Sequence, residues 1–108
     1  ELDFTPWAGA STRVPADATA FAHRSARFLV KHRLTVPAAA ADPGRRWLRR
    51  SWELTHPWGT GGSYQNFPDP DLPSPTDGYH TTNAARVRRI RQRYDPQRRF
   101  DPDAERSG

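Results

Sequence analysis

Cysteine and methionine are absent from this sequence of 108 residues, and Lys31 is its single lysine. Without cysteine the chain forms no disulfide framework, no thiolate zinc site and no thioether link to a cofactor, so we expect no metal site. Long apolar runs are lacking too, and no stretch has the pattern of a signal peptide or a membrane span. We therefore expect a soluble chain that does not enter a membrane, and its compartment is left open.

Apolar residues are also scarce, at 34% of the sequence against 27% charged residues. A chain of this length buries a smaller share of its surface than a longer chain does. Together with 11 prolines and 7 glycines, this predicts one small unit at most, either a fragment or a module that needs a partner. We assign that unit to residues 1–100 and predict a disordered tail over residues 101–108.

Positive charge gathers near the C-terminus of a chain whose formal net charge is +5. Residues 86–99 hold seven arginines, with Asp95 as their only acid. Such a run can neutralise the phosphates of a nucleic acid. A run of this kind is more often the solvated face of a helix, so we do not expect nucleic acid as the partner.

The first half of the chain predicts a strand and a helix, after a loop or short strand over residues 1–20. Aromatic and β-branched residues alternate over residues 28–36, which predicts a half-covered antiparallel strand. Asp42 as cap and Pro43 at the first position then open a helix that ends before Pro57. Apolar and small polar side chains share one face of this helix, which we expect to be buried. They are Trp47, Leu48, Ser51, Trp52 and Thr55.

The second half predicts a long loop and a terminal helix. Glycine and proline recur through residues 57–78, so this stretch is expected to be irregular, with one short extended piece over residues 63–67. Residues 83–94 contain no helix breaker and place Val87, Ile90 and Tyr94 on one face. They predict an amphipathic helix.

Two stretches of this second half have a specific spacing. One is a Tyr-x-Asn-aromatic unit, Tyr64 to Phe67, within GGSYQNFPDPD (residues 61–71). The other is the terminal helix within YHTTNAARVRRIRQRYDPQRRF (residues 79–100). Preceded by GASTRVPADATAFAHR (residues 9–24), this order resembles the C-terminal segment of berberine-bridge-enzyme-like FAD-linked oxidoreductases, a family that includes oligosaccharide oxidases and aclacinomycin-type oxidoreductases. The resemblance covers nearly the whole chain.

The resemblance implies an α+β fold, namely part of an antiparallel sheet backed by helices that is incomplete on its own. It implies an FAD cofactor bound mainly by a domain absent from this chain and supplied in cis or in trans. The implied substrate is a small alcohol or sugar-type molecule. Dioxygen is the implied electron acceptor, although these residues leave oxidase and dehydrogenase both open.

By the same resemblance, Tyr64 is the catalytic base that takes a hydroxyl proton while hydride passes to the flavin. A free phenol titrates near ~10, so a tyrosine base needs nearby positive charge or hydrogen-bond donors. An extended backbone would project Tyr64 and Asn66 from one side, with Gly61 and Gly62 letting the backbone approach a planar cofactor. Asn66 is then a flavin contact, because its amide both donates and accepts. A packed aromatic and a turn-forming amide are the structural alternatives.

Other polar residues receive mostly structural interpretations. His32 lies on the more apolar face of the predicted strand and is our candidate for lining the substrate cavity, with a packed histidine as the alternative. We expect Asn83 and Arg86 to fix the terminal helix against the flavin domain. His56 and His80 are expected to be exposed.

A second function class stays open beside the enzymatic one. The chain is then a standalone, non-catalytic remnant that binds a partner, possibly a nucleic acid, through its arginine-rich terminal helix. Binding to phosphates would weaken steeply as the salt concentration rises, which separates the two interpretations.

Overall fold

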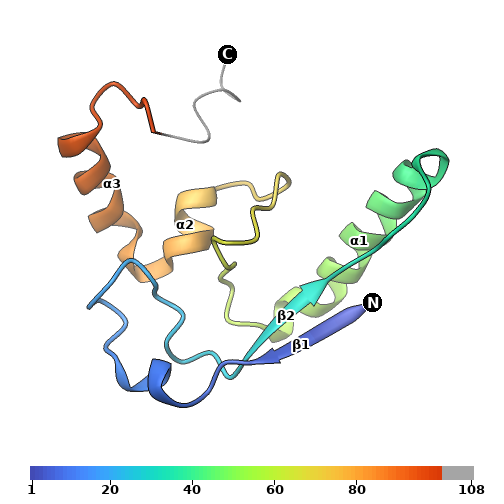
Figure 1. Cartoon of the computed structure of the whole chain (residues 1–108), viewed down its shortest axis with the longest axis horizontal. Helices are drawn as coiled ribbons and strands as arrows, with labels where there is room; N and C mark the ends of the chain where they lie inside the picture. The colour runs from blue at the N-terminus through green and yellow to red at the C-terminus, as the bar shows by residue number, and fades with distance from the viewer. Residues whose placement is uncertain (101–108) are drawn as a thin grey trace.

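A computed structural model describes residues 1–100 of the chain (Figure 1). The predicted disordered tail, residues 101–108, lies outside the described residues. Two strands and three α-helices are joined by long loops and by short 3-10 turns. In chain order the strands and α-helices are β1 (Leu2–Pro6), β2 (Phe28–His32), α1 (Ala41–Thr55), α2 (Pro75–His80) and α3 (Ala84–Tyr94).

The two strands form an antiparallel sheet in which Leu2 lies opposite His32 and Pro6 lies opposite Phe28. On the face of the sheet opposite to Leu2 and His32, Lys31 Nζ forms an ion pair with Asp3 Oδ2 at 2.9 Å. The strand predicted over residues 28–36 is confirmed but ends at His32. It ends there because β1 begins at Leu2, so residues beyond Arg33 find no further backbone partner on that strand.

Helix α1 packs along β2 and the residues that follow it (Figure 1). A Cβ placed on Gly44 would lie 3.1 Å from the Leu34 side chain and 3.2 Å from that of Val36, so glycine brings the helix close to the extended chain. The packed face contains Gly44, Leu48, Ser51 and Thr55, each buried or half-buried.

Two details of the α1 prediction are wrong. The helix begins at Ala41, with Ala40 as its N-cap, so Asp42 lies inside the first turn. The tryptophans do not anchor a buried face either, since Trp47 is 44% exposed and Trp52 is 36% exposed. The approach at Gly44 turns the small residues towards the strand and leaves the indole rings at the sides of the helix.

The second packed region joins α2 and α3 to the loop after β1, at the opposite end of the molecule from α1 (Figure 1). Asn83 is 6% exposed, and its side-chain amide donates to the carbonyl oxygens of Ala16 and Thr19. His80 is 8% exposed and donates from Nδ1 to the carbonyl oxygen of Ala20. The expectation that His80 is exposed is therefore wrong, because its ring closes this interface.

A charged contact ties α2 to α3. The Asp77 carboxylate accepts a hydrogen bond from the Ser74 hydroxyl and pairs with Arg88. The Ser74 hydrogen bond, and after it the Arg88 guanidinium, lower the pKa of Asp77 below its ordinary value. Helix α2 begins inside residues 57–78, which we expected to be mostly irregular, and extends to His80.

The described chain is flat and open, with extents of 44 × 41 × 20 Å and a radius of gyration of 15.8 Å. A compact domain of this length has a radius of about 13 Å. The buried residues are small or polar: Ala22, Ala26, Gly44, His80, Asn83 and Ala84. The predicted α+β class, an antiparallel sheet with helices in an incomplete domain, is confirmed.

Candidate active site

Tyr64 and Asn66 lie on a tight turn in the loop between α1 and α2. The Phe67 amide donates to the Tyr64 carbonyl oxygen at 3.0 Å, which closes the turn. The Asn66 Nδ2 atom donates to the Tyr64 phenolic oxygen at 2.9 Å. The sequence correctly placed these two side chains together, but the extended backbone predicted for residues 63–67 is wrong, since a turn brings them into contact.

Three aromatic rings surround the ring of Tyr64 in edge-to-face contacts. Trp7 lies 4.8 Å from it between ring centroids, Phe67 lies at 5.6 Å and Phe21 at 6.0 Å. Each such contact adds about 0.5–1.5 kcal/mol beyond the area it buries. The Tyr64 ring is thus held by residues from three separate parts of the chain. Sequence reasoning missed Trp7 and Phe21, because no local pattern links them to the loop.

His23 packs against two rings of this cluster. Its ring packs against Trp7 and Phe21, and its Nε2 donates to the Tyr79 carbonyl oxygen at 3.0 Å. A Cβ on Gly62 would lie 2.6 Å from the His23 ring. Gly62 therefore makes room for His23, and the approach of a cofactor to this backbone stays a prediction.

Gly61, unlike Gly62, has open space on the side where a Cβ would lie. Its φ is +79°, a conformation that favours glycine, and a Cβ placed there would meet no atom within 4 Å. The backbone before Tyr64 thus has an open side at Gly61, which leaves room for a ligand.

Two cations stand over the rings of the cluster. Lys31 Nζ lies 5.2 Å from the Phe67 ring centroid, and the Arg24 guanidinium lies 4.7 Å from that of Phe21. The group that directly contacts the Tyr64 oxygen is the Asn66 amide. The hydrogen-bond donor to the Tyr64 oxygen is therefore a neutral side chain.

His32 lies under α1. Its Nδ1 is 2.9 Å from Ser51 Oγ, and its Nε2 is 3.1 Å from Thr55 Oγ1. Burial lowers the pKa of His32 below its ordinary value. Both ring nitrogens thus hold α1 on β2, and a place for His32 in the substrate cavity stays a prediction.

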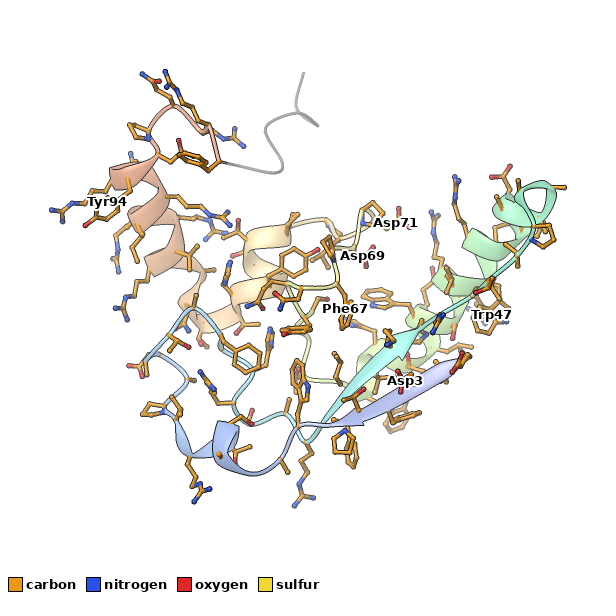
Figure 2. The ribbon with its side chains drawn as sticks, in the orientation of Figure 1. Asp3, Trp47, Phe67, Asp69, Asp71 and Tyr94 are labelled. Carbon is orange, nitrogen blue, oxygen red and sulfur yellow. The ribbon has the colours of Figure 1, made fainter. Side chains whose placement is uncertain are left out.

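The two aspartates after the turn, Asp69 and Asp71, close the loop. The Asp71 amide donates to Asp69 Oδ1 at 2.9 Å, and the Asp69 amide donates to the Tyr79 hydroxyl at 2.7 Å. Figure 2 shows Phe67, Asp69 and Asp71 following one another along this loop, beside α2. Tyr79 connects the loop to His23, because its carbonyl oxygen accepts the histidine proton.

The polar side chains at the start of α3 contact this chain's own residues. Arg86 donates to the Asp17 carbonyl oxygen and Arg91 to the Thr76 hydroxyl. Asn83 and Arg86 are therefore structural as predicted, but they hold the helix to residues 16–19, where we had expected a flavin domain. These contacts also reduce the number of arginines available to phosphates, which weakens the nucleic-acid alternative.

The far end of α3 carries an uncovered apolar face. Ile90 is 47% exposed and Tyr94 is 73% exposed, and Figure 2 shows Tyr94 pointing away from the rest of the molecule. An open hollow of about 280 Å³ lies here. It is lined by Ile90, Arg91, Tyr94, Asp95, Arg98 and Phe100.

Within residues 1–100, no group of three or more histidine and acidic side chains is placed to hold a metal ion. No helix among these residues is long and apolar enough to cross a membrane.

Comparison with known proteins shows what this chain is similar to. Residues 63–103 match the family described as "Berberine and berberine like". The turn that carries Tyr64 and all of α3 fall inside this match. Residues 63–103 thus resemble the berberine-like family, and the resemblance seen in the sequence is confirmed.

Two curated relatives align along most of the chain. An uncharacterized FAD-linked oxidoreductase, YvdP, from Bacillus subtilis (strain 168) is 34% identical over 98 residues, which is 90% of this chain. A chitooligosaccharide oxidase from Gibberella zeae is 29% identical over 109 residues, or 93% of this chain. The chain spans 22% of the length of each relative. No solved structure matches it.

Proposed function

We propose that this chain is the C-terminal substrate-domain segment of an FAD-dependent oxidoreductase that oxidises an alcohol or sugar-type substrate, with Tyr64 as the base. The contact between Tyr64 and Asn66 carries this proposal, because it places a donor on the phenolic oxygen of a ring that three aromatic neighbours hold. The relatives support it by name, one as an FAD-linked oxidoreductase and the other as a chitooligosaccharide oxidase.

The residues around the turn fit a flavin edge. Asn66 is exposed, and after its hydrogen bond to Tyr64 it retains a second N–H donor and the Oδ1 acceptor. We propose that these two groups contact the carbonyl and ring-nitrogen edge of the flavin, next to the open side of Gly61. FAD itself would be held mainly by residues outside this chain, in cis or in trans. When bound, it supplies the acceptor for a hydride.

In the proposed reaction the Tyr64 phenolate accepts the proton of a substrate hydroxyl. The carbon that bears the hydroxyl gives up its hydrogen with two electrons as a hydride, and a C=O bond forms. One proton thus goes to Tyr64 and one hydride to the cofactor, so atoms and charges balance. We propose dioxygen as the final electron acceptor, with hydrogen peroxide as its product.

The test is Tyr64→Phe in the full-length, FAD-loaded protein that contains this segment. Anaerobic reduction by N,N′-diacetylchitobiose is followed by the loss of visible flavin absorbance. We expect a rate about 10²–10⁴-fold lower, because a general base contributes that much, with the FAD content unchanged. Tyr94→Phe is the matched control, since Tyr94 is exposed at the far end of α3. An unchanged rate in Tyr64→Phe would remove Tyr64 from the reaction.

The acceptor is tested separately. After reduction, admitting air to the wild-type protein should restore the flavin absorbance and release one hydrogen peroxide per flavin. Slow reoxidation that a dye acceptor accelerates would instead assign the protein to the dehydrogenases.

A further inference from the structure

We propose that Asn66 is a positioning residue for Tyr64, which directs the phenolic oxygen and stabilises its deprotonated form. This inference rests on the proposed role of Tyr64 as the base. It adds a second role to the flavin contact proposed for Asn66, and it starts from the hydrogen bond between the two side chains.

The geometry restrains the phenolic oxygen twice. Edge-to-face contacts with Trp7 and Phe67 restrain the ring plane, so the oxygen can move only with the whole ring. The Asn66 amide, 2.9 Å away, then occupies one acceptor position of that oxygen. The turn between the residues keeps the amide in reach, because it is closed by its own backbone hydrogen bond.

The chemistry favours the phenolate. A donor strengthens its hydrogen bond when the acceptor becomes charged, so Asn66 stabilises deprotonated Tyr64 more than neutral Tyr64. With one acceptor position of the oxygen taken by Asn66, another remains for the proton of a substrate hydroxyl. The amide thus selects both the protonation state and the direction from which a proton can arrive.

Neighbouring groups do not replace this contact. Lys31 and Arg24 bring positive charge to the cluster. Lys31 lies over the Phe67 ring and Arg24 over the Phe21 ring, so neither lies over the ring of Tyr64. Gln65 lies between the two residues in sequence, and its Oε1 is buried with no hydrogen-bond partner among residues 1–100. Among residues 1–100, the hydrogen bond to the Tyr64 hydroxyl comes from Asn66 and none comes from Gln65.

The first test is the pH dependence of flavin reduction in the full-length, FAD-loaded protein, with N,N′-diacetylchitobiose as the reductant. In Asn66→Ala, the pH at which the rate is half-maximal should rise by about one pH unit or more, since hydrogen bonds to charged groups are worth about 1.5–3 kcal/mol. Asn66→Asp removes the donor at the same size and adds a negative charge, so it should raise that pH further. Gln65→Ala is the control and should leave it unchanged.

The second test needs no turnover. Ultraviolet difference titration of the wild type against Tyr64→Phe isolates ionisation of the Tyr64 phenol, and the same subtraction is made in the Asn66→Ala background. We expect the Tyr64 transition to move to higher pH when Asn66 is replaced. A structural role for Asn66 in the turn would alter stability without moving this transition.

The outcomes separate the inference from the proposal beneath it. If Tyr64→Phe reduces its flavin at the normal rate, the base proposal fails. If Tyr64→Phe is slow but Asn66→Ala moves neither the pH profile nor the phenol titration, Tyr64 remains the base and the positioning role is overturned. A change in the visible flavin spectrum alone would likewise overturn positioning and leave Asn66 as a flavin contact.

Discussion

The side-chain amide of Asn83 donates a hydrogen bond to the carbonyl oxygen of Ala16 at 2.6 Å, across 67 positions of the sequence. The same nitrogen also donates to Thr19 at 3.0 Å. Because Asn83 is buried, one side chain at the start of α3 holds the loop that leads back to the aromatic cluster.

We therefore predict that Asn83→Ala loosens residues 14–21. The variant leaves two carbonyl oxygens without their donor, which costs about 1–3 kcal/mol of local stability. Amide hydrogen exchange in the full-length protein should become faster in that loop. Gln92→Ala, which removes an exposed amide from the same helix, should leave exchange unchanged. Equal exchange in both variants would show that other contacts hold the loop.

Gly62→Ala should disturb the aromatic cluster. The new methyl group would lie 2.6 Å from the His23 ring, and that ring is fixed by its hydrogen bond to Tyr79. We expect a loss of about 1–3 kcal/mol of stability, as for other overpacked sites, together with a change in the near-ultraviolet circular dichroism of Trp7 and its neighbours. Gly59→Ala is the control, because its φ is −90° and its nearest atom is 3.4 Å away. If Gly62→Ala changed neither the stability nor the circular dichroism, the His23 ring would be free to move aside.

The attachment of α1 should depend on pH through His32. Burial lowers its pKa below 6.5 in the folded state, so the folded chain binds this proton less readily than the unfolded chain. The contribution of His32 to the stability is therefore complete at a pH above its pKa in the unfolded chain, 6.5. It is lost as the pH falls through 6.5 towards the lower pKa of His32 in the folded chain. Exchange protection of α1, corrected for the intrinsic pH dependence of amide exchange, should be lower at about pH 5 than at about pH 7.5.

His32→Gln should abolish this difference, since glutamine keeps polar atoms near Ser51 and Thr55 but does not titrate. His56→Gln, placed just after α1, should retain it. A wild-type α1 with equal protection at both pH values would contradict the effect.

Thr81→Gly should stabilise the junction of α2 and α3. Thr81 has φ 42° and ψ −114°, a conformation that is strained for a β-branched residue. Such strain costs about 1–3 kcal/mol. Glycine removes this strain, and its greater flexibility in the unfolded chain destabilises the folded state by only about 0.5–1 kcal/mol. Thermal unfolding of the full-length protein should therefore shift upward, whereas Thr82→Gly, next in the chain and without a positive φ, should shift it downward. A downward shift in Thr81→Gly would mean that its side chain contributes more than its backbone costs.

Local patterns predicted β2, α1 and α3 but not α2. Apolar spacing located α3, and the residue alternation located β2, because both signals act within a few residues. The buried face of a helix was harder to predict. Nothing near Trp47 reveals that Gly44 brings α1 against Leu34 and Val36, so the buried side of that helix was assigned wrongly.

The candidate site was predicted in part for the same reason. Tyr64 and Asn66 are close in sequence, and we expected both side chains on one side of the chain, but neither the turn nor the hydrogen bond between them was predicted. Trp7 reaches the cluster by tertiary packing, and His80 is buried by a loop some 60 positions earlier. Such contacts depend on the whole fold, which no short window of sequence contains.

The rings that hold Tyr64 have a consequence for recombination between proteins of this type. The family match begins at residue 63, yet Trp7 and Phe21, which pack against Tyr64, lie well before it. A chimera joined at residue 63 would take the tyrosine from one parent and two of the rings packed against it from the other. The unit to exchange is therefore the whole stretch from β1 onward, and a crossover is best tolerated before Leu2.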